Sequence, residues 1–174
     1  MSYIGQTLII ALRFIIPCFM PFFPFDAIWA NFILDVTDGD LLGVLGMNGQ
    51  TYQLIDKAAD YWSYIFMVIA GRNWKIRKTL YWLFGLRTIG QLLFFSTQKE
   101  MFLFYFPNFL GPLITVYVTL MYFLKSEDAA YRFYRKYLII IWILIVVYKM
   151  SGEWTLHYAN IDLSLLLFGL NGNK

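Results

Sequence analysis

Long apolar blocks dominate this chain of 174 residues and limit what it can fold into. Hydrophobic residues make up 60% of the sequence and charged residues only 14%, whereas a soluble domain usually carries about 25% charged residues. The apolar residues fall in continuous runs rather than in alternating stripes. This pattern excludes a disordered chain and an ordinary soluble enzyme, and it predicts an all-α integral membrane protein.

The single cysteine and the single histidine, Cys18 and His157, exclude several chemistries. One cysteine allows neither an intramolecular disulfide nor a cysteine-based metal cluster. One histidine excludes a multi-histidine zinc site and argues against a Ser-His-Asp mechanism. The formal net charge of +3 is too small to indicate a nucleic-acid partner, so none is expected.

The apolar blocks predict how many helices cross a membrane. One crossing needs about 20 mostly apolar residues. The candidate segments are residues 7–36, 52–70, 79–96, 101–124 and 137–150. Prolines between positions 17 and 24 allow the first segment to form two shortened helices. We therefore expect a single domain, residues 1–174, built as a bundle of five or six transmembrane helices. The tail 151–174 has too short an apolar run to cross and predicts an interfacial or partner-docking helix.

Basic residues concentrate in two of the predicted loops. Residues 71–78 and 125–136 together hold eight of the 14 Lys and Arg residues. The positive-inside rule places such loops on the cytoplasmic side of a membrane. The first of them could also bind anionic lipid.

Four aspartates have a spacing that points to metal chemistry. Asp35 and Asp38 are separated by three positions, and Asp56 and Asp60 by four, so each pair lies on one face of a helix. Carboxylates that converge repel each other unless cations lie between them, and hard ions such as Mg²⁺ or Mn²⁺ suit oxygen ligands. Paired metals of this kind stabilise in-line attack on phosphorus. The pattern predicts a metal site formed by Asp35, Asp38, Asp56 and Asp60.

The same residues resemble the signature of the CDP-alcohol phosphatidyltransferases, D-x2-D-G-x2-A-R-x8-G-x3-D-x3-D. The four aspartates and Gly39 stand at the offsets of that signature, whereas Leu42, Gly43 and Tyr52 replace its alanine, arginine and second glycine. Upstream, the segment LIIALRFIIP is similar to the first helix of that family. The resemblance covers roughly residues 6–65.

The resemblance implies an activity and a role for each matching residue. It implies metal-dependent transfer of a phosphatidyl-type group from a CDP-linked lipid to an alcohol, with release of CMP. Asp35, Asp38 and Asp56 would bind metal, Asp60 would be both a metal ligand and the general base, and Gly39 would lie against the substrate. Membrane lipid would be the partner. Arg87, midway along a predicted span, could bind a substrate phosphate or pair with an internal acid.

Other interpretations of the aspartates stay open at this level. The first group could be a solvated turn, and Asp56 with Asp60 could complement a helix dipole. Asp35, Asp38 and Asp40 could also form a structural Ca²⁺ site. The alternative to an enzyme is a non-enzymatic integral membrane subunit, a degenerate relative that packs against other membrane subunits.

Overall fold

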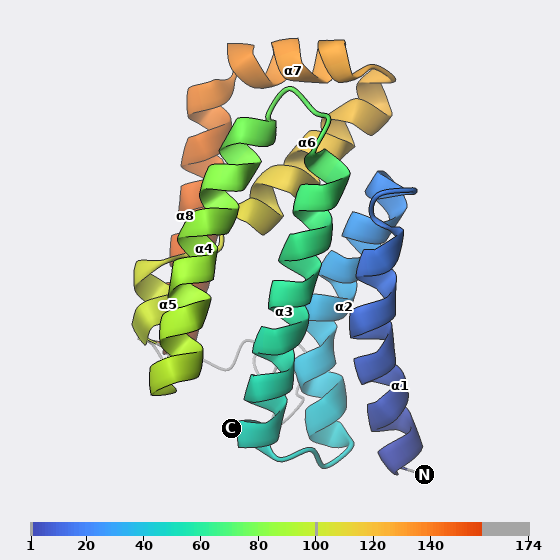
Figure 1. Ribbon diagram of the computed structural model, residues 1–174, viewed down its shortest axis with the longest axis vertical. Coiled ribbons are helices and arrows are strands. Elements are labelled where there is room, and N and C mark those ends of the chain that lie inside the picture. The colour runs from blue at the N-terminus through green and yellow to red at the C-terminus, as the bar shows by residue number, and fades with distance from the viewer. Residues whose placement is uncertain (1, 100, 158–174) are drawn as a thin grey trace.

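The computed structural model describes residues 2–99 and 101–157, and this part of the chain is helical with no strand (Figure 1). A short 3₁₀ helix, η1 (Ile16–Phe19), follows the first α-helix. The α-helices are α1 (Ser2–Ile15), α2 (Pro24–Val44), α3 (Gly49–Gly71), α4 (Arg77–Thr97), α5 (Met101–Tyr105), α6 (Leu110–Leu124), α7 (Glu127–Lys136) and α8 (Leu138–His157).

The long helices lie roughly side by side, and α7 crosses one end of the bundle (Figure 1). Helices α1, α2 and α3 contact one another, α4 packs on α3, and α6 packs on α2, α3 and α4. The core lies where these helices meet. It includes Ile28 of α2, Tyr64 of α3, and Leu113 and Tyr117 of α6, each at most 3% exposed.

Local sequence signals define the hairpin of α2 and α3. Pro24 occupies the first turn of α2, where its missing N–H costs nothing. The helix ends before Gly46, whose φ of +79° is a left-handed conformation that suits glycine. The Asn48 side chain then accepts a hydrogen bond from the backbone N–H of Gln50 and caps α3. The chain therefore reverses within a few residues, and α2 and α3 run antiparallel.

The predicted bundle of five or six transmembrane helices is wrong. Among the described residues, no helix is both long enough and apolar enough to cross a membrane. The predicted first segment is interrupted by η1 and the turn before Pro24, and the predicted segment 101–124 is interrupted between α5 and α6. The longer helices carry charge instead, with four aspartates in α2 and three basic residues in α4.

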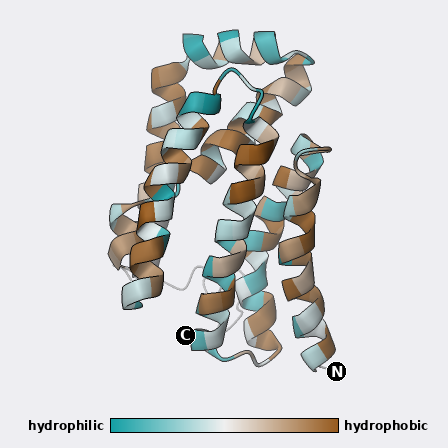
Figure 2. Ribbon diagram, viewed as in Figure 1, coloured by the Kyte–Doolittle hydropathy of each residue, from teal (hydrophilic) through white to brown (hydrophobic). Residues whose placement is uncertain are grey.

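Polar residues concentrate at the end of the bundle that α7 crosses. The predicted loop 125–136 is mostly helix α7, and Figure 2 shows that α7 and the α3–α4 connection are the most hydrophilic part of that end of the molecule. Most of the predicted tail helix, residues 158–174, lies outside the described residues.

Two glycines of α4 provide a test of this packing. A Cβ at Gly90 would lie 2.6 Å from Cβ of Phe106, which cannot rotate away because it is next to the backbone. We expect Gly90→Ala to lower the free energy of unfolding by about 1–3 kcal/mol, the usual range for overpacking. Denaturant unfolding followed by circular dichroism measures the change.

Gly85→Ala is the matched control on the same helix. A Cβ there has no neighbour within 4 Å, so the higher helix propensity of alanine should raise the free energy of unfolding by about 0.5–1 kcal/mol. Equal effects of the two substitutions would contradict the close approach of α4 to Phe106.

Candidate functional site

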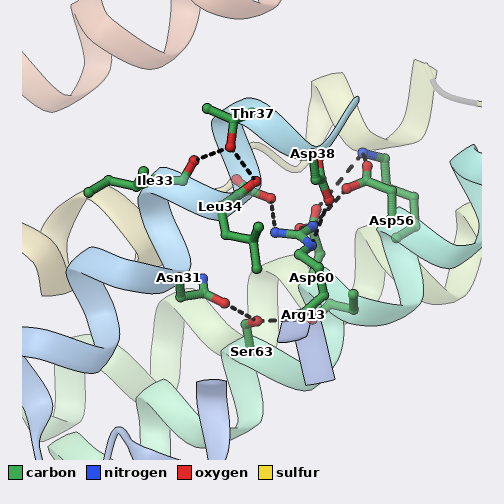
Figure 3. Close-up of polar contacts among 12 residues, drawn as sticks. Arg13, Asn31, Ile33, Leu34, Thr37, Asp38, Asp56, Asp60 and Ser63 are labelled. Carbon is green, nitrogen blue, oxygen red and sulfur yellow. Dashed lines mark hydrogen bonds and ion pairs between the residues drawn. The ribbon is translucent and has the colours of Figure 1, made fainter. Parts of the chain in front are cut away.

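The guanidinium of Arg13 contacts all four aspartates, and Figure 3 shows it among Asp38, Asp56 and Asp60. Its Nη1 donates to Oδ1 of Asp35 at 2.5 Å. Its Nη2 donates to Oδ1 of Asp56 at 2.8 Å and to Oδ1 of Asp60 at 3.0 Å. Its Nε lies 2.9 Å from Oδ2 of Asp38. We call Arg13 and these four residues the acid cluster.

The register of three helices assembles the acid cluster. In the antiparallel α2–α3 hairpin, residues at about equal distances from Met47 lie opposite one another. Asp38 and Asp56 are each nine residues from it, and Asp35 and Asp60 are twelve and thirteen residues from it. The same register brings Ser63 to Asn31, where the Ser63 hydroxyl donates to the Asn31 side chain at 2.9 Å. Helix α1 packs against both helices of the hairpin and supplies the cation.

A second cation, Lys57, supports the cluster from α3. Its Nζ lies 2.6 Å from Oδ2 of Asp56 and 3.8 Å from Oδ2 of Asp60. Four carboxylates, one guanidinium and one ammonium leave a formal charge of −2. Because the Arg13 side chain is only 2% exposed, solvent screens this excess weakly, and the cluster favours a proton or a further cation.

Asp38 is the most enclosed of the four carboxylates. One of its oxygens faces Arg13, and the other accepts a hydrogen bond from the Tyr52 hydroxyl at 3.1 Å. Burial of the 2% exposed side chain raises the pKa of Asp38 to about 6, against the opposing effect of Arg13. Both oxygens are thus in use, and Asp38 acts within the cluster as a partner of Arg13 and Tyr52.

Asp35 and Asp60 lie together, and their surroundings shift their pKa values in opposite directions. The surrounding protein and the charge of Asp60 raise the pKa of Asp35 above its usual range, although 42% of its side chain is exposed. Burial alone would also raise the pKa of Asp60, but the charges of Lys57, Arg13 and Arg87 lower it to about 2. The ionised form of Asp60 is therefore favoured, and the protonated form of Asp35 is more accessible than that of an isolated aspartate.

Three of the predicted ligands are close enough to share one metal ion. One carboxylate oxygen from each of Asp35, Asp56 and Asp60 lies within 4.8 Å of the other two. Asp38 and Asp40 are outside this group, so the structure does not bring together the alternative Ca²⁺ site of Asp35, Asp38 and Asp40. The donor set fits a hard divalent cation, which would compete with Arg13 for the same carboxylates.

A polar cavity borders the acid cluster. Its volume is about 70 Å³, and Asp35 and Asp60 line it with Asn31, Ser63 and Tyr64. Asn108 is also in its wall and donates to the Tyr64 hydroxyl at 2.9 Å. The cavity thus offers carboxylate, amide and hydroxyl groups on one side of the cluster.

A larger apolar cavity adjoins the polar one. Its volume is about 400 Å³, and it is lined by residues of α2, α6 and α8 such as Trp29, Val116 and Ile145. The two cavities share four wall residues, Phe32, Pro112, Thr115 and Tyr148. Together they form an amphipathic space, with its polar part next to the acid cluster.

Gly39 and Arg87, the two predicted substrate-binding residues, do not line the polar cavity. A Cβ at Gly39 would lie 2.9 Å from the Tyr52 hydroxyl, so Tyr52 covers this glycine. Arg87 is 4% exposed, and its Nη1 donates to the carbonyl oxygens of Leu103 and Phe106, which ties α4 to α5.

Two other features of the site, the central position of Arg13 and the amphipathic cavity, differ in whether the sequence indicates them. The sequence indicates the first, because an arginine within an apolar helix needs an internal partner. It does not indicate the amphipathic cavity, since the walls of this cavity come from residues up to 120 positions apart along the chain, from Trp29 to Lys149.

Comparison with known proteins found no similarity: no protein-family model, no curated protein and no solved structure matches this chain.

Replacing Arg13 tests whether it holds the acid cluster together. Arg13→Met keeps the length of the side chain and removes its charge, which leaves four carboxylates with Lys57 alone. We expect a loss of about 3–5 kcal/mol in the free energy of unfolding at pH 8, typical of a broken buried ion pair. The loss should shrink toward pH 4, because the carboxylates of the folded variant become protonated and no longer repel one another.

Unfolding curves between pH 4 and pH 8 measure this difference. Arg77→Met, a change of an exposed base at the start of α4, is the control and should have little effect. A deficit of the Arg13 variant that does not depend on pH would argue against electrostatic repulsion as its cause. Added Mg²⁺ should restore stability to the Arg13 variant if the carboxylates bind metal.

Proposed function

We propose that this chain is a metal-dependent phosphotransferase that moves a phosphatidyl-type group from a CDP-linked lipid to an alcohol and releases CMP. One observation carries the proposal: a cluster of four aspartates borders a polar cavity that continues into an apolar one. An amphipathic substrate fits such a space, with its polar group at the carboxylates and its hydrocarbon chain among Trp29, Val116 and Ile145. Lipid is therefore the proposed partner.

The resemblance to the CDP-alcohol phosphatidyltransferases supports the same assignment. The aspartates that match the signature of that family are the four that contact Arg13, and Arg13 itself belongs to the segment that resembles the first helix of the family. The spacing of the signature corresponds to the register of the α2–α3 hairpin, which explains why the aspartates occur at those offsets.

Within this proposal, each carboxylate has a distinct task. Asp35, Asp56 and Asp60 would hold Mg²⁺ or Mn²⁺, which would neutralise charge on the diphosphate of the donor. Asp60 is the proposed general base, and its charge makes it an acceptor for the proton of the alcohol. Its low pKa makes it a weak base, so Asp35, with its raised pKa, is the second carboxylate able to take that proton.

A non-enzymatic subunit is the second candidate, and a specific observation favours it. Arg13 and Lys57 already neutralise half of the carboxylate charge. Tyr52 covers Gly39, whereas the signature of the family has a glycine at each of these two positions. The cluster would then only stabilise the fold, while the helix surfaces contact other proteins.

Asp60→Asn tests the catalytic role. The substitution keeps the size of the side chain and removes the base, so we expect the turnover number to fall by about 10²- to 10⁴-fold while the protein remains folded. The assay measures release of CMP from a CDP-linked lipid in the presence of Mg²⁺ and an added alcohol. Asp35→Asn and Asp56→Asn should raise the concentration of Mg²⁺ needed for half-maximal rate.

Asp40→Asn is the matched control, because Asp40 lies on α2 close to the cluster in sequence but outside the group of three ligands. It should leave the rate unchanged. The pH profiles of the Asp35 and Asp60 variants identify which carboxylate takes the proton. If no alcohol supports metal-dependent release of CMP, and chelator does not change the stability of the protein, the enzyme proposal fails and the subunit proposal stands.

Filling the apolar cavity tests whether it holds a hydrocarbon chain. Val116→Trp places a large side chain in its wall. We expect the rate with a long-chain donor to fall by roughly tenfold or more, because each buried CH₂ contributes about 0.8 kcal/mol. A short-chain, water-soluble donor should be affected much less.

Val147→Trp on α8 is the control, since Val147 is 59% exposed and does not line that cavity. An equal loss with long-chain and short-chain donors would place the hydrocarbon chain elsewhere.

A further inference from the structure

Eight basic residues gather at the end of the bundle where α3 ends, α4 begins and α7 crosses (Figure 1). All eight are exposed: Arg72, Lys75, Arg77, Lys78, Lys125, Arg132, Arg135 and Lys136. We call this surface the basic end. Its two segments, residues 71–78 and 125–136, contain only two acids and so carry a formal charge of +6, while the remainder of the chain carries −3.

Contacts between the two segments hold the basic end together. The backbone N–H of Lys75 donates to Oε1 of Glu127 at 2.8 Å, and its Nζ forms an ion pair with Asp128. The Tyr117 hydroxyl also donates to Glu127, at 2.6 Å. Both acids therefore serve to join α7 to the α3–α4 connection, and the positive charge of the other bases faces outward.

Exposed apolar side chains lie close to these bases along the chain. Trp82 on α4 is 81% exposed, and Phe123 at the end of α6 is 71% exposed. Phe133 on α7 and Ile139 at the start of α8 are also exposed. Lys125 lies over the ring of Tyr122, with Nζ 4.2 Å from the ring centroid. Exposed apolar side chains thus lie within four residues of a base of the basic end along the chain, near one end of α4, α6 and α8 and within α7.

We propose that the basic end binds the headgroup layer of an anionic phospholipid membrane. Lys and Arg near such a surface are attracted by its negative potential, and aromatic side chains prefer the boundary between headgroups and acyl chains. A nucleic acid would also attract the bases, but the aliphatic Ile139 and the highly exposed Phe123 suit acyl chains better than a sugar-phosphate backbone.

This surface is separate from the acid cluster. Asp60 and Gly71 are eleven residues apart on α3, which corresponds to roughly 16 Å along the helix. The proposal therefore does not depend on the phosphotransferase activity, and the two can fail independently.

Vesicle flotation with the full chain tests the proposal. Vesicles of phosphatidylcholine alone are compared with vesicles that contain phosphatidylglycerol as well. We expect the apparent affinity for the anionic vesicles to be at least roughly tenfold higher at low salt, and the difference to disappear at high salt. Arg132→Gln/Arg135→Gln should also remove most of the difference.

Two further variants separate charge from apolar contact. Lys99→Gln, at an exposed base after α4 and away from the basic end, is the control and should bind as the parent does. Trp82→Ser should weaken binding to both kinds of vesicle. Equal binding to neutral and anionic vesicles, or unchanged binding of the double variant, would overturn the proposal. Release of the protein from anionic vesicles by a short RNA at equal charge concentration would overturn it in favour of a nucleic-acid surface.

Discussion

The contact of Arg13 with four carboxylates is the interaction on which the arrangement of α1, α2 and α3 depends. Four acids from two helices can lie together only if cations reduce their mutual repulsion, and Arg13 is 2% exposed at their centre. The ion pairs thereby determine the depth and rotation of α1 against the α2–α3 hairpin. Apolar packing alone would allow these helices to slide, whereas five charged groups with defined donors and acceptors permit one register.

The pairing of the aspartates was accessible from the sequence, because the i, i+3 and i, i+4 spacings place each pair on one helix face. The central cation was harder to assign. Arg13 was visible as a charge within an apolar segment, but its partner depends on how α1 docks, and this docking is decided by contacts among three helices.

The transmembrane prediction failed because hydrophobicity summed over a block ignores where helices begin and end. Residues 7–36 form one apolar block, yet η1 and Pro24 divide it into separate helices. The block 101–124 is divided in the same way, so that α6 has only 15 residues. The amphipathic cavity was inaccessible for a different reason, since its walls combine residues of α2, α6 and α8 that have no shared sequence pattern.

The chain order of the acid cluster has a consequence for synthesis on the ribosome. Arg13 is made first, and the bond to Asp60 spans 47 residues. At about 5–20 residues per second, roughly 2–9 s pass between the emergence of the arginine and that of its last partner. During this interval α1 carries a cation with an incomplete set of counter-ions and cannot dock in its final position. The segment from Arg13 to Asp60 is therefore the shortest stretch of nascent chain that contains every charge of this cluster.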